Sequence, residues 1–149
     1  MTATRDKADV RGTPAASRLV TPPLGLYVHL PWCVRKCPYC DFNSHTAPDQ
    51  LPVADYLEAL RADLEHELAR AGERAIETVF IGGGTPSLFP PDAIGQILEW
   101  LAPRLTTDAE ITLEANPGTL EQGRFAAFRA HGVNRLSIGV QSFDAGRLQ

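Results

Sequence analysis

Residues 24–40 read LGLYVHLPWCVRKCPYC, an alternating apolar and polar run that leads directly into three closely spaced cysteines. The two-residue period over residues 24–30 predicts a β-strand. Cys33, Cys37 and Cys40 follow in what we expect to be the loop after that strand. This order, a strand and then a cysteine loop, guides the interpretation of the rest of the chain.

Beyond the loop, segments with helical and strand periodicity alternate. We expect helices over residues 53–68, over residues 92–101 and around Phe125 and Phe128, and strands over residues 76–81, 110–115 and 134–140, with a fourth helix barely begun at the end. Alternating strands and helices form parallel βαβ units with right-handed crossovers. The sequence therefore predicts an α/β fold of about four βα units, too few to close a (β/α) barrel.

The two ends of the chain differ from this regular part. Residues 1–23 mix charge, Ala, Thr and Pro without periodicity, so we expect a flexible tail there and an ordered domain over residues 24–149. Met1 is typical of a natural start, but a last strand followed by less than two turns of helix would leave a raw sheet edge. We expect the N-terminal part of a longer protein, poorly soluble by itself.

Composition narrows the class of protein. An apolar fraction of 44% with 21% charged residues is typical of a soluble globular domain. A net charge of −4 lacks the basic footprint of a nucleic-acid-binding protein. No apolar stretch approaches the roughly 20 residues needed to span a bilayer, and the N-terminus has no signal-peptide core, so we expect the cytoplasm.

The cysteine spacing suits one polynuclear metal centre. Clustered thiols in a reducing compartment are more often metal ligands or redox groups than disulfides. Cys33, Cys37 and Cys40 place three thiolates within one short loop, whereas ordinary ferredoxin clusters take four cysteines. Three ligands and an open position are typical of a reactive site. Arg35 and Lys36 would offset the anionic charge of the ligated centre.

Two alternatives remain open from spacing alone. The three cysteines could bind structural zinc with His29 or His45 as the fourth ligand. Cys37 and Cys40 could also form a redox pair, although Cys33 would then have no role.

Polar residues of one parity recur in three expected strands. A parallel strand covered on both faces is normally apolar throughout, so this pattern indicates a polar interior facing a ligand. We expect the other parity, including Leu136, Ile138 and Val140, to pack against the helices. The polar set consists of Tyr27 and His29, Thr112 and Glu114, and Arg135, Ser137, Gly139 and Gln141.

The run Gly82-Gly83-Gly84-Thr85-Pro86 follows the second expected strand. Glycine lets the backbone approach a ligand closely and adopt positive φ. The run is neither a P-loop nor a Rossmann fingerprint, because the required Lys-Ser/Thr and glycine spacing are missing. A tight βα turn would explain it equally well.

The stretch YVHLPWCVRKCPYCDFNSH resembles the signature of the radical S-adenosylmethionine (SAM) superfamily, a Cys-x3-Cys-x2-Cys loop with an aromatic before the third cysteine. The residues Tyr27, His29 and Pro31 are similar to the Tyr-x-His-x-Pro of the coproporphyrinogen III oxidase-related branch. The resemblance extends from about residue 24 to the end. It implies a partial (β/α) barrel of radical SAM type.

The resemblance also implies cofactors and site residues. It implies that the three cysteines bind a 4Fe-4S cluster, with SAM on the open iron, and that a reduced cluster generates a 5′-deoxyadenosyl radical. Glu114 matches a family acidic residue whose carboxylate can accept both ribose hydroxyls. The residues implied to contact SAM are Tyr27, Tyr39, Gly83, Gly84, Thr85, Glu114 and Gln141.

One position separates two groups within the branch. Oxygen-independent coproporphyrinogen III decarboxylases carry a further cysteine two residues after the third ligand, where this chain has Phe42. The resemblance is therefore greater to the sister group HemW, heme chaperones that deliver heme to respiratory proteins. It implies heme or a porphyrin as ligand, heme-receiving proteins and an electron donor as partners, and leaves open whether the chain belongs to an enzyme.

Overall fold

The computed structural model of the 149-residue chain describes residues 20–117 and 119–148, without the side chains of residues 119–122. The tail expected over residues 1–23 lies outside the described residues as far as residue 19. The helix expected around Phe125 and Phe128 is present as α3.

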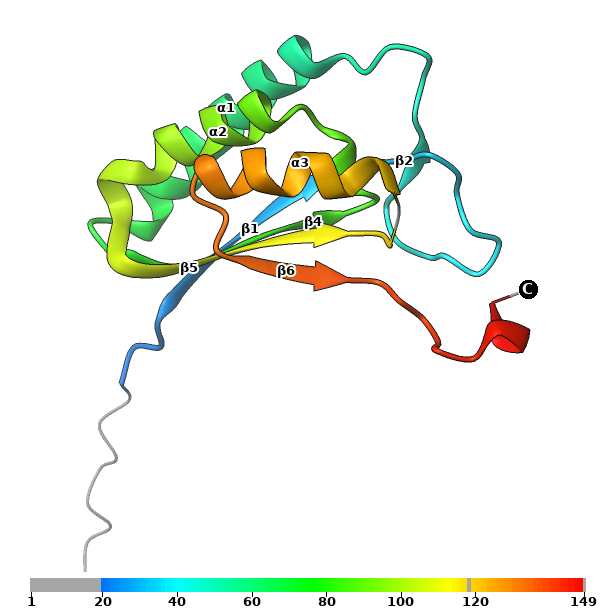
Figure 1. Ribbon diagram of the computed structural model, residues 1–149. Coiled ribbons are helices and arrows are strands. Elements are labelled where there is room, and N and C mark those ends of the chain that lie inside the picture. Colours follow the sequence, from blue (N-terminus) through cyan, green and yellow to red (C-terminus); the bar gives the residue numbers. More distant parts are fainter. Residues whose placement is uncertain (1–19, 118, 149) are drawn as a thin grey trace, which may run out of the picture.

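Within the described residues, four parallel strands form one sheet in the order β1-β4-β5-β6. The bounds of these strands are Leu24–Leu30 (β1), Ile76–Gly83 (β4), Leu105–Ala115 (β5) and Arg135–Ile138 (β6). The helices are α1 (Val53–Ala71), α2 (Pro91–Leu101) and α3 (Thr119–Ala130). Figure 1 shows these helices over one face of the sheet.

Short elements complete this part of the chain. The 3-10 turns are η1 (Pro86–Leu88), η2 (Ala102–Arg104) and η3 (Ala145–Arg147), and a two-stranded parallel pairing joins β2 (Trp32–Cys33) to β3 (His45–Thr46). The predicted α/β fold, a partial barrel of about four βα units, is confirmed. No helix among the described residues is long and apolar enough to cross a membrane.

Strand alternation determines where the core lies. Val28, Ile81 and Leu113 are in register on neighbouring strands, and all three are buried beneath the helices. Burying each such side chain contributes about 1.5–3 kcal/mol. The helices contribute Leu57 and Leu64, Ile94, Ile97, Leu98 and Leu101, and Phe128 to the same core. The polar parity lies on the opposite face.

The apolar face of β6 departs from the prediction. Leu136 and Ile138 were expected to pack against helices, but they are 36% and 45% exposed. β6 is the last strand of the described sheet, and within the described residues only the short η3 follows it. Leu136 lies at a cavity that Phe125 and Arg129 of α3 also line, so the helix cover of β6 is partial.

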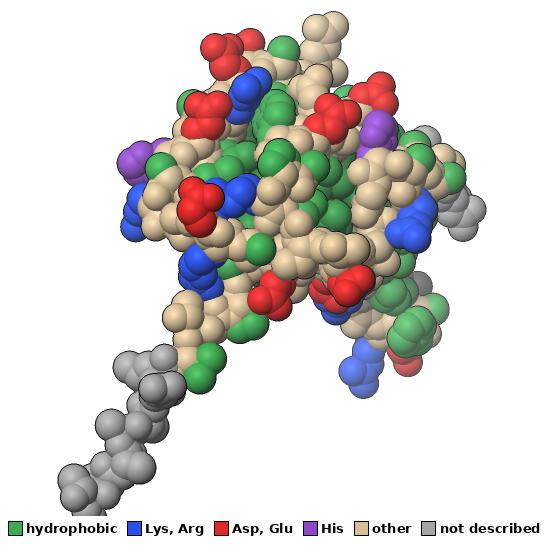
Figure 2. All heavy atoms as spheres, turned by 90° about the vertical axis from the view of Figure 1, so that its left-hand side faces the viewer, with side chains coloured by type: hydrophobic (Ala, Val, Ile, Leu, Met, Phe, Trp, Pro, Cys, Tyr) green, Lys and Arg blue, Asp and Glu red, His purple; other side chains and the backbone are tan. Residues whose placement is uncertain are grey.

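Charged side chains of both signs are interspersed over the side of the molecule that Figure 2 presents, around a group of apolar side chains. The same side carries the amino ends of the strands, opposite the cysteine loop. The charge distribution there is mixed.

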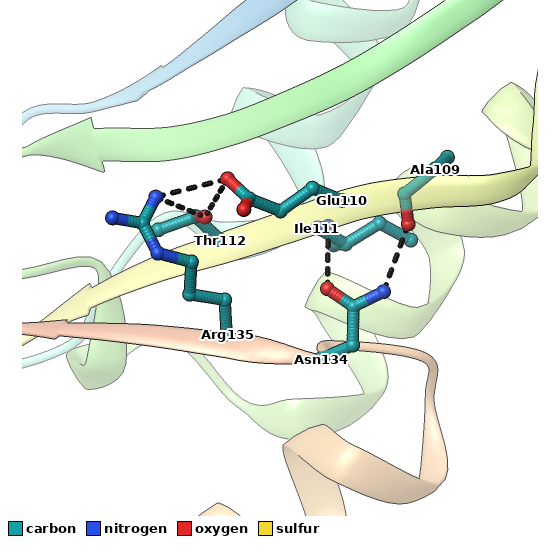
Figure 3. Close-up of polar contacts among 6 residues, drawn as sticks. All are labelled: Ala109, Glu110, Ile111, Thr112, Asn134 and Arg135. Carbon is teal, nitrogen blue, oxygen red and sulfur yellow. Dashed lines mark hydrogen bonds and ion pairs between the residues drawn. The ribbon is translucent and has the colours of Figure 1, made fainter.

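Two contacts attach β6 to β5 in different ways (Figure 3). The Asn134 side chain accepts a hydrogen bond from the Ile111 N–H at 2.7 Å and donates one to the Ala109 carbonyl at 2.8 Å, as a neighbouring strand would. Arg135 instead forms an exposed ion pair with Glu110 at 2.9 Å. The Asn134 side-chain amide therefore supplies the hydrogen-bond partners that a neighbouring strand would give to Ala109 and Ile111. The ion pair of Arg135 and Glu110 is exposed to solvent.

We expect Asn134→Ala to lower the free energy of unfolding by about 1–3 kcal/mol, because two backbone groups of β5 lose their partners. Arg135→Ala removes an exposed ion pair and is expected to cost about 0–1 kcal/mol. Urea unfolding followed by circular dichroism measures both. An Arg135→Ala cost equal to or above that of Asn134→Ala contradicts this assignment.

Candidate functional site

The cysteine loop is closed at its base by backbone pairing. Trp32 and Cys33 pair with His45 and Thr46 in parallel. The amide of His45 donates to the Pro31 carbonyl at 2.8 Å, and the amide of Ala47 donates to the Cys33 carbonyl at 2.8 Å. The cysteine loop, residues 31–47, is therefore closed at its base, and its two ends lie side by side.

The glycine run is attached to the first residues of this loop. The amide of Gly84 donates to the Leu30 carbonyl at 2.9 Å, and the amide of Thr85 donates to the Trp32 carbonyl at 2.8 Å. A Cβ on Gly84 would lie 2.7 Å from the carbonyl oxygens of Pro31 and Trp32. Such contacts are too short for any side chain, so the close approach that requires glycine here is to the cysteine loop itself.

Gly83 is constrained in two ways. Its φ of 125° is rarely adopted by residues with a side chain, and an added Cβ would lie 2.7 Å from the Leu30 carbonyl oxygen. Its amide donates to Glu114 Oε2 at 3.1 Å, which links the end of β4 to the end of β5.

Aromatic packing ties the loop to the core. The Trp32 ring lies 4.6 Å from that of Tyr56 and 5.4 Å from that of Phe89, measured between centroids. The Tyr56 hydroxyl donates to the His29 carbonyl at 2.7 Å. Burial raises the pKa of Tyr56, and the charges of Tyr27 and Asp63 add to that effect. The helix α1 is thereby connected to the end of β1.

His29 connects the first strand to the end of the loop. Its Nε2 lies 2.8 Å from the Asn43 carbonyl oxygen, which can only accept, so Nε2 carries the proton. In the neutral ring Nδ1 then accepts from the Tyr27 hydroxyl, 2.9 Å away. Burial raises the pKa of Tyr27, with a further contribution from the negative charge of Glu114.

One cleft of about 250 Å³ lies between the cysteine loop and the carboxyl ends of the strands. It brings together all the residues predicted to bind the cluster or SAM except Tyr27, whose hydroxyl is directed to His29. Of the polar strand residues predicted to face a ligand, His29, Thr112 and Arg135 also lie outside its lining. The lining consists of Cys33, Arg35, Cys37, Tyr39, Cys40, Phe42, Gly83, Gly84, Thr85, Pro86, Glu114, Ala115, Asn116, Ser137, Ile138, Gly139 and Gln141.

Asn116 is a site residue that sequence reasoning missed. Its side-chain amide donates to the hydroxyl of Thr85 at 3.0 Å, and Thr85 is buried. Asn116 follows β5 directly, and a polar residue just beyond the carboxyl end of a parallel strand is a signal that could have identified it.

Gln141 adopts an uncommon backbone conformation at the edge of the cleft. Its φ of 64° lies in the left-handed region, which non-glycine residues enter at an energetic cost. The side-chain amide donates to the Gly139 carbonyl at 3.3 Å, and the Gly139 amide donates to Ala115 at 3.1 Å. This backbone keeps the amide of Gln141 at the cleft.

The three thiols are free and differ in exposure. Cys33 and Cys40 are half-buried, while Cys37 is exposed. A hydrogen bond with Cys37, together with the negative charge of its thiolate, raises the pKa of Tyr39. Within the described part of the chain, no three His, Cys, Asp or Glu side chains lie close enough together to hold a metal ion. The cysteines thus share a cleft without converging on one point.

The strand, the cysteine loop and the cleft at the carboxyl ends of the parallel sheet agree with the radical SAM resemblance of the sequence. The family model of the radical SAM superfamily matches residues 27–148, so the chain belongs to that superfamily. The predicted resemblance is confirmed.

Two curated relatives indicate which branch of the radical SAM superfamily the chain resembles. The chain is 53% identical to the heme chaperone HemW of Escherichia coli over 130 residues, which cover 86% of this chain and 34% of that protein. It is 43% identical to the mitochondrial radical S-adenosyl methionine domain-containing protein 1 of Bos taurus over 147 residues, which cover 97% of this chain and 33% of that protein. The chain spans about a third of the length of these curated relatives.

A solved structure supports the same fold. The coproporphyrinogen III oxidase HemN of Escherichia coli, described as a radical SAM enzyme, superposes with a TM-score of 0.73 at 34% identity. The match covers 83% of this chain and 29% of that one.

We expect Gly84→Ala to displace the cysteine loop and lower the free energy of unfolding by about 1–3 kcal/mol, because its Cβ would overlap two loop carbonyls. The loop thiols should react faster with a thiol reagent. Gly123→Ala is the matched control, since nothing lies within 4 Å of its Cβ in α3 and alanine favours a helix. Equal thiol reactivity in Gly84→Ala and the unmodified protein would be contrary to this expectation.

Proposed function

We propose that this chain supplies the cluster-binding and SAM-binding part of a HemW-type heme chaperone. Cys33, Cys37 and Cys40 ligate a 4Fe-4S cluster, and the adjoining cleft holds SAM. The observation that carries the proposal is the single cleft that joins the cysteine loop to the polar ends of β4, β5 and β6. The whole protein would handle heme, as the name of its HemW relatives states. Delivery of that heme to respiratory proteins in the cytoplasm is part of the same proposal.

The donor chemistry of the loop fits such a cluster. The loop supplies three free thiols, whereas an ordinary ferredoxin cluster takes four cysteines, so a cluster held by this loop would have one iron open for another ligand. Arg35 lines the cleft and provides a positive charge near the thiolates. The sulfurs have to draw together on ligation, and the exposed positions of Cys37 and Tyr39 leave the loop tip room to do so.

The cleft offers suitable groups for SAM. We assign the ribose hydroxyls to Glu114, whose carboxylate keeps acceptor capacity after its bond with the Gly83 amide. The glycine run and Thr85 would line the methionine moiety, and Gln141 lines the same cleft. The backbone at Tyr39 would approach the adenine. For Tyr27 to reach the SAM carboxylate, its hydroxyl would have to leave His29.

When bound, the reduced cluster supplies an electron that breaks a carbon–sulfur bond of SAM, which is the cofactors' own chemistry. The protein's residues hold and shield the two groups. An external electron donor is part of the proposal.

Anaerobic reconstitution with iron and sulfide should give a brown protein with about four irons per chain. Replacing Cys33, Cys37 or Cys40 by Ala should each abolish the visible absorption, because a ligand is lost. His45→Ala is the control, since this residue would matter only to the zinc alternative. A colourless protein that retains zinc would overturn the cluster assignment.

The alternative function is oxygen-independent coproporphyrinogen III oxidation, favoured by the likeness to HemN. Phe42 argues against it, because this exposed side chain lines the cleft where the decarboxylases carry a further cysteine. We expect the full-length protein to bind heme in an absorbance titration. It should not decarboxylate coproporphyrinogen III under anaerobic conditions with SAM and a reductant. The reverse pair of results would support the decarboxylase.

A further inference from the structure

Ser44 lies beneath the third cysteine of the loop. Its relative exposure is 1%, and its hydroxyl oxygen is 3.6 Å from the Cys40 sulfur. A hydrogen bond to sulfur is longer than one to oxygen because the sulfur atom is larger. Among the described residues, this sulfur is the partner of the Ser44 hydroxyl.

The backbone on both sides of Ser44 fixes the direction of the hydroxyl. Its amide donates to the Phe42 carbonyl at 2.7 Å, and its carbonyl accepts from Lys36 Nζ at 3.0 Å. The neighbouring residues are also held, since Asn43 accepts from His29 and His45 donates to Pro31. Ser44 is therefore a rigid point of a loop whose tip is exposed.

The direction of the hydrogen bond follows from the chemistry of ligation. A cysteine that binds iron is a thiolate and has no proton to donate. The Ser44 hydroxyl has one, so it must be the donor in the ligated form. A donor at the sulfur draws negative charge away from the cluster and stabilises the reduced state, which is the more negative one.

We propose that Ser44 is a positioning residue that holds the Cys40 sulfur and raises the reduction potential of the cluster by donating a hydrogen bond to it. The inference rests on the proposed function, because it requires the three cysteines to ligate the cluster. It assigns a role to the serine of the CDFNSH stretch.

The test compares Ser44→Ala with Ser44→Thr in the reconstituted full-length protein. Electron paramagnetic resonance during a redox titration gives the ratio of reduced to oxidised cluster at each potential. We expect Ser44→Ala to lower this ratio about threefold at a fixed potential, equivalent to about 30 mV at 59 mV per tenfold for one electron. Ser44→Thr keeps the hydroxyl and should restore the unmodified value. Val34→Ala, at an exposed position of the same loop, is the control and should leave the ratio unchanged.

Two further outcomes distinguish a failure of the proposed function from a failure of the role assigned to Ser44. If the unmodified protein assembles no iron–sulfur cluster, the proposed function fails. If it assembles one and Ser44→Ala leaves the ratio unchanged, only the role of Ser44 is overturned.

A readout that does not need Ser44→Ala covers the case in which that variant retains no cluster. Resonance Raman spectra of the unmodified protein and Ser44→Thr in H₂O and D₂O should show an iron–cysteine stretching mode that shifts on deuteration. No shift in either protein would overturn the hydrogen bond.

Discussion

At the carboxyl end of β4, the amides of Gly84 and Thr85 donate hydrogen bonds to carbonyls of the chain that leaves β1. These bonds continue the parallel pairing of the two strands into the loop that carries the cysteines. Since a Cβ at Gly84 would overlap that loop, the two backbones are in direct contact. The glycine run, which forms one wall of the cleft, and the start of the cysteine loop are therefore held against each other. A displacement of either would move the other.

The two faces of the sheet have different roles: one stabilises the fold, and the other carries the polar side chains of the candidate site. Apolar residues of one parity pack beneath the helices and supply the burial free energy, while the polar parity is left on the other face. Trp32 belongs to the cysteine loop, but its ring packs against Tyr56 and Phe89 on the side of the helices. A loop without periodic structure thus has an anchor in the core that the helices also share.

Sequence periodicity predicts the strands and helices because each has one buried face, and β1 and α2 lie within a residue of the expected bounds. It places the start of β5 five residues late, at 110 instead of Leu105, because pairing with Ile76 extends β5 through residues without clear alternation. Leu136 and Ile138 were predicted buried, since alternation marks an apolar face without showing what covers it. The cysteines, the glycine run and Glu114 were predicted from local motifs. The hydrogen bonds of His29 to Asn43 and of Asn116 to Thr85 join segments that are distant in the sequence, and the contact of Ser44 with Cys40 depends on the conformation of the loop, so periodicity does not predict these partners.

For the proposed cluster site, the different exposures of the three thiols predict the order in which they would bind iron. Fixing the backbone of one residue costs about 1–2 kcal/mol, so a loop that had to order throughout would weaken ligation considerably. Here Cys33 belongs to the paired base of the loop, and Cys40 is held at the buried Ser44, so that cost is largely met in the folded chain. Cys37 is exposed. We therefore expect a cluster to be held first by Cys33 and Cys40, with the movement that brings three sulfurs together confined to the tip around Cys37.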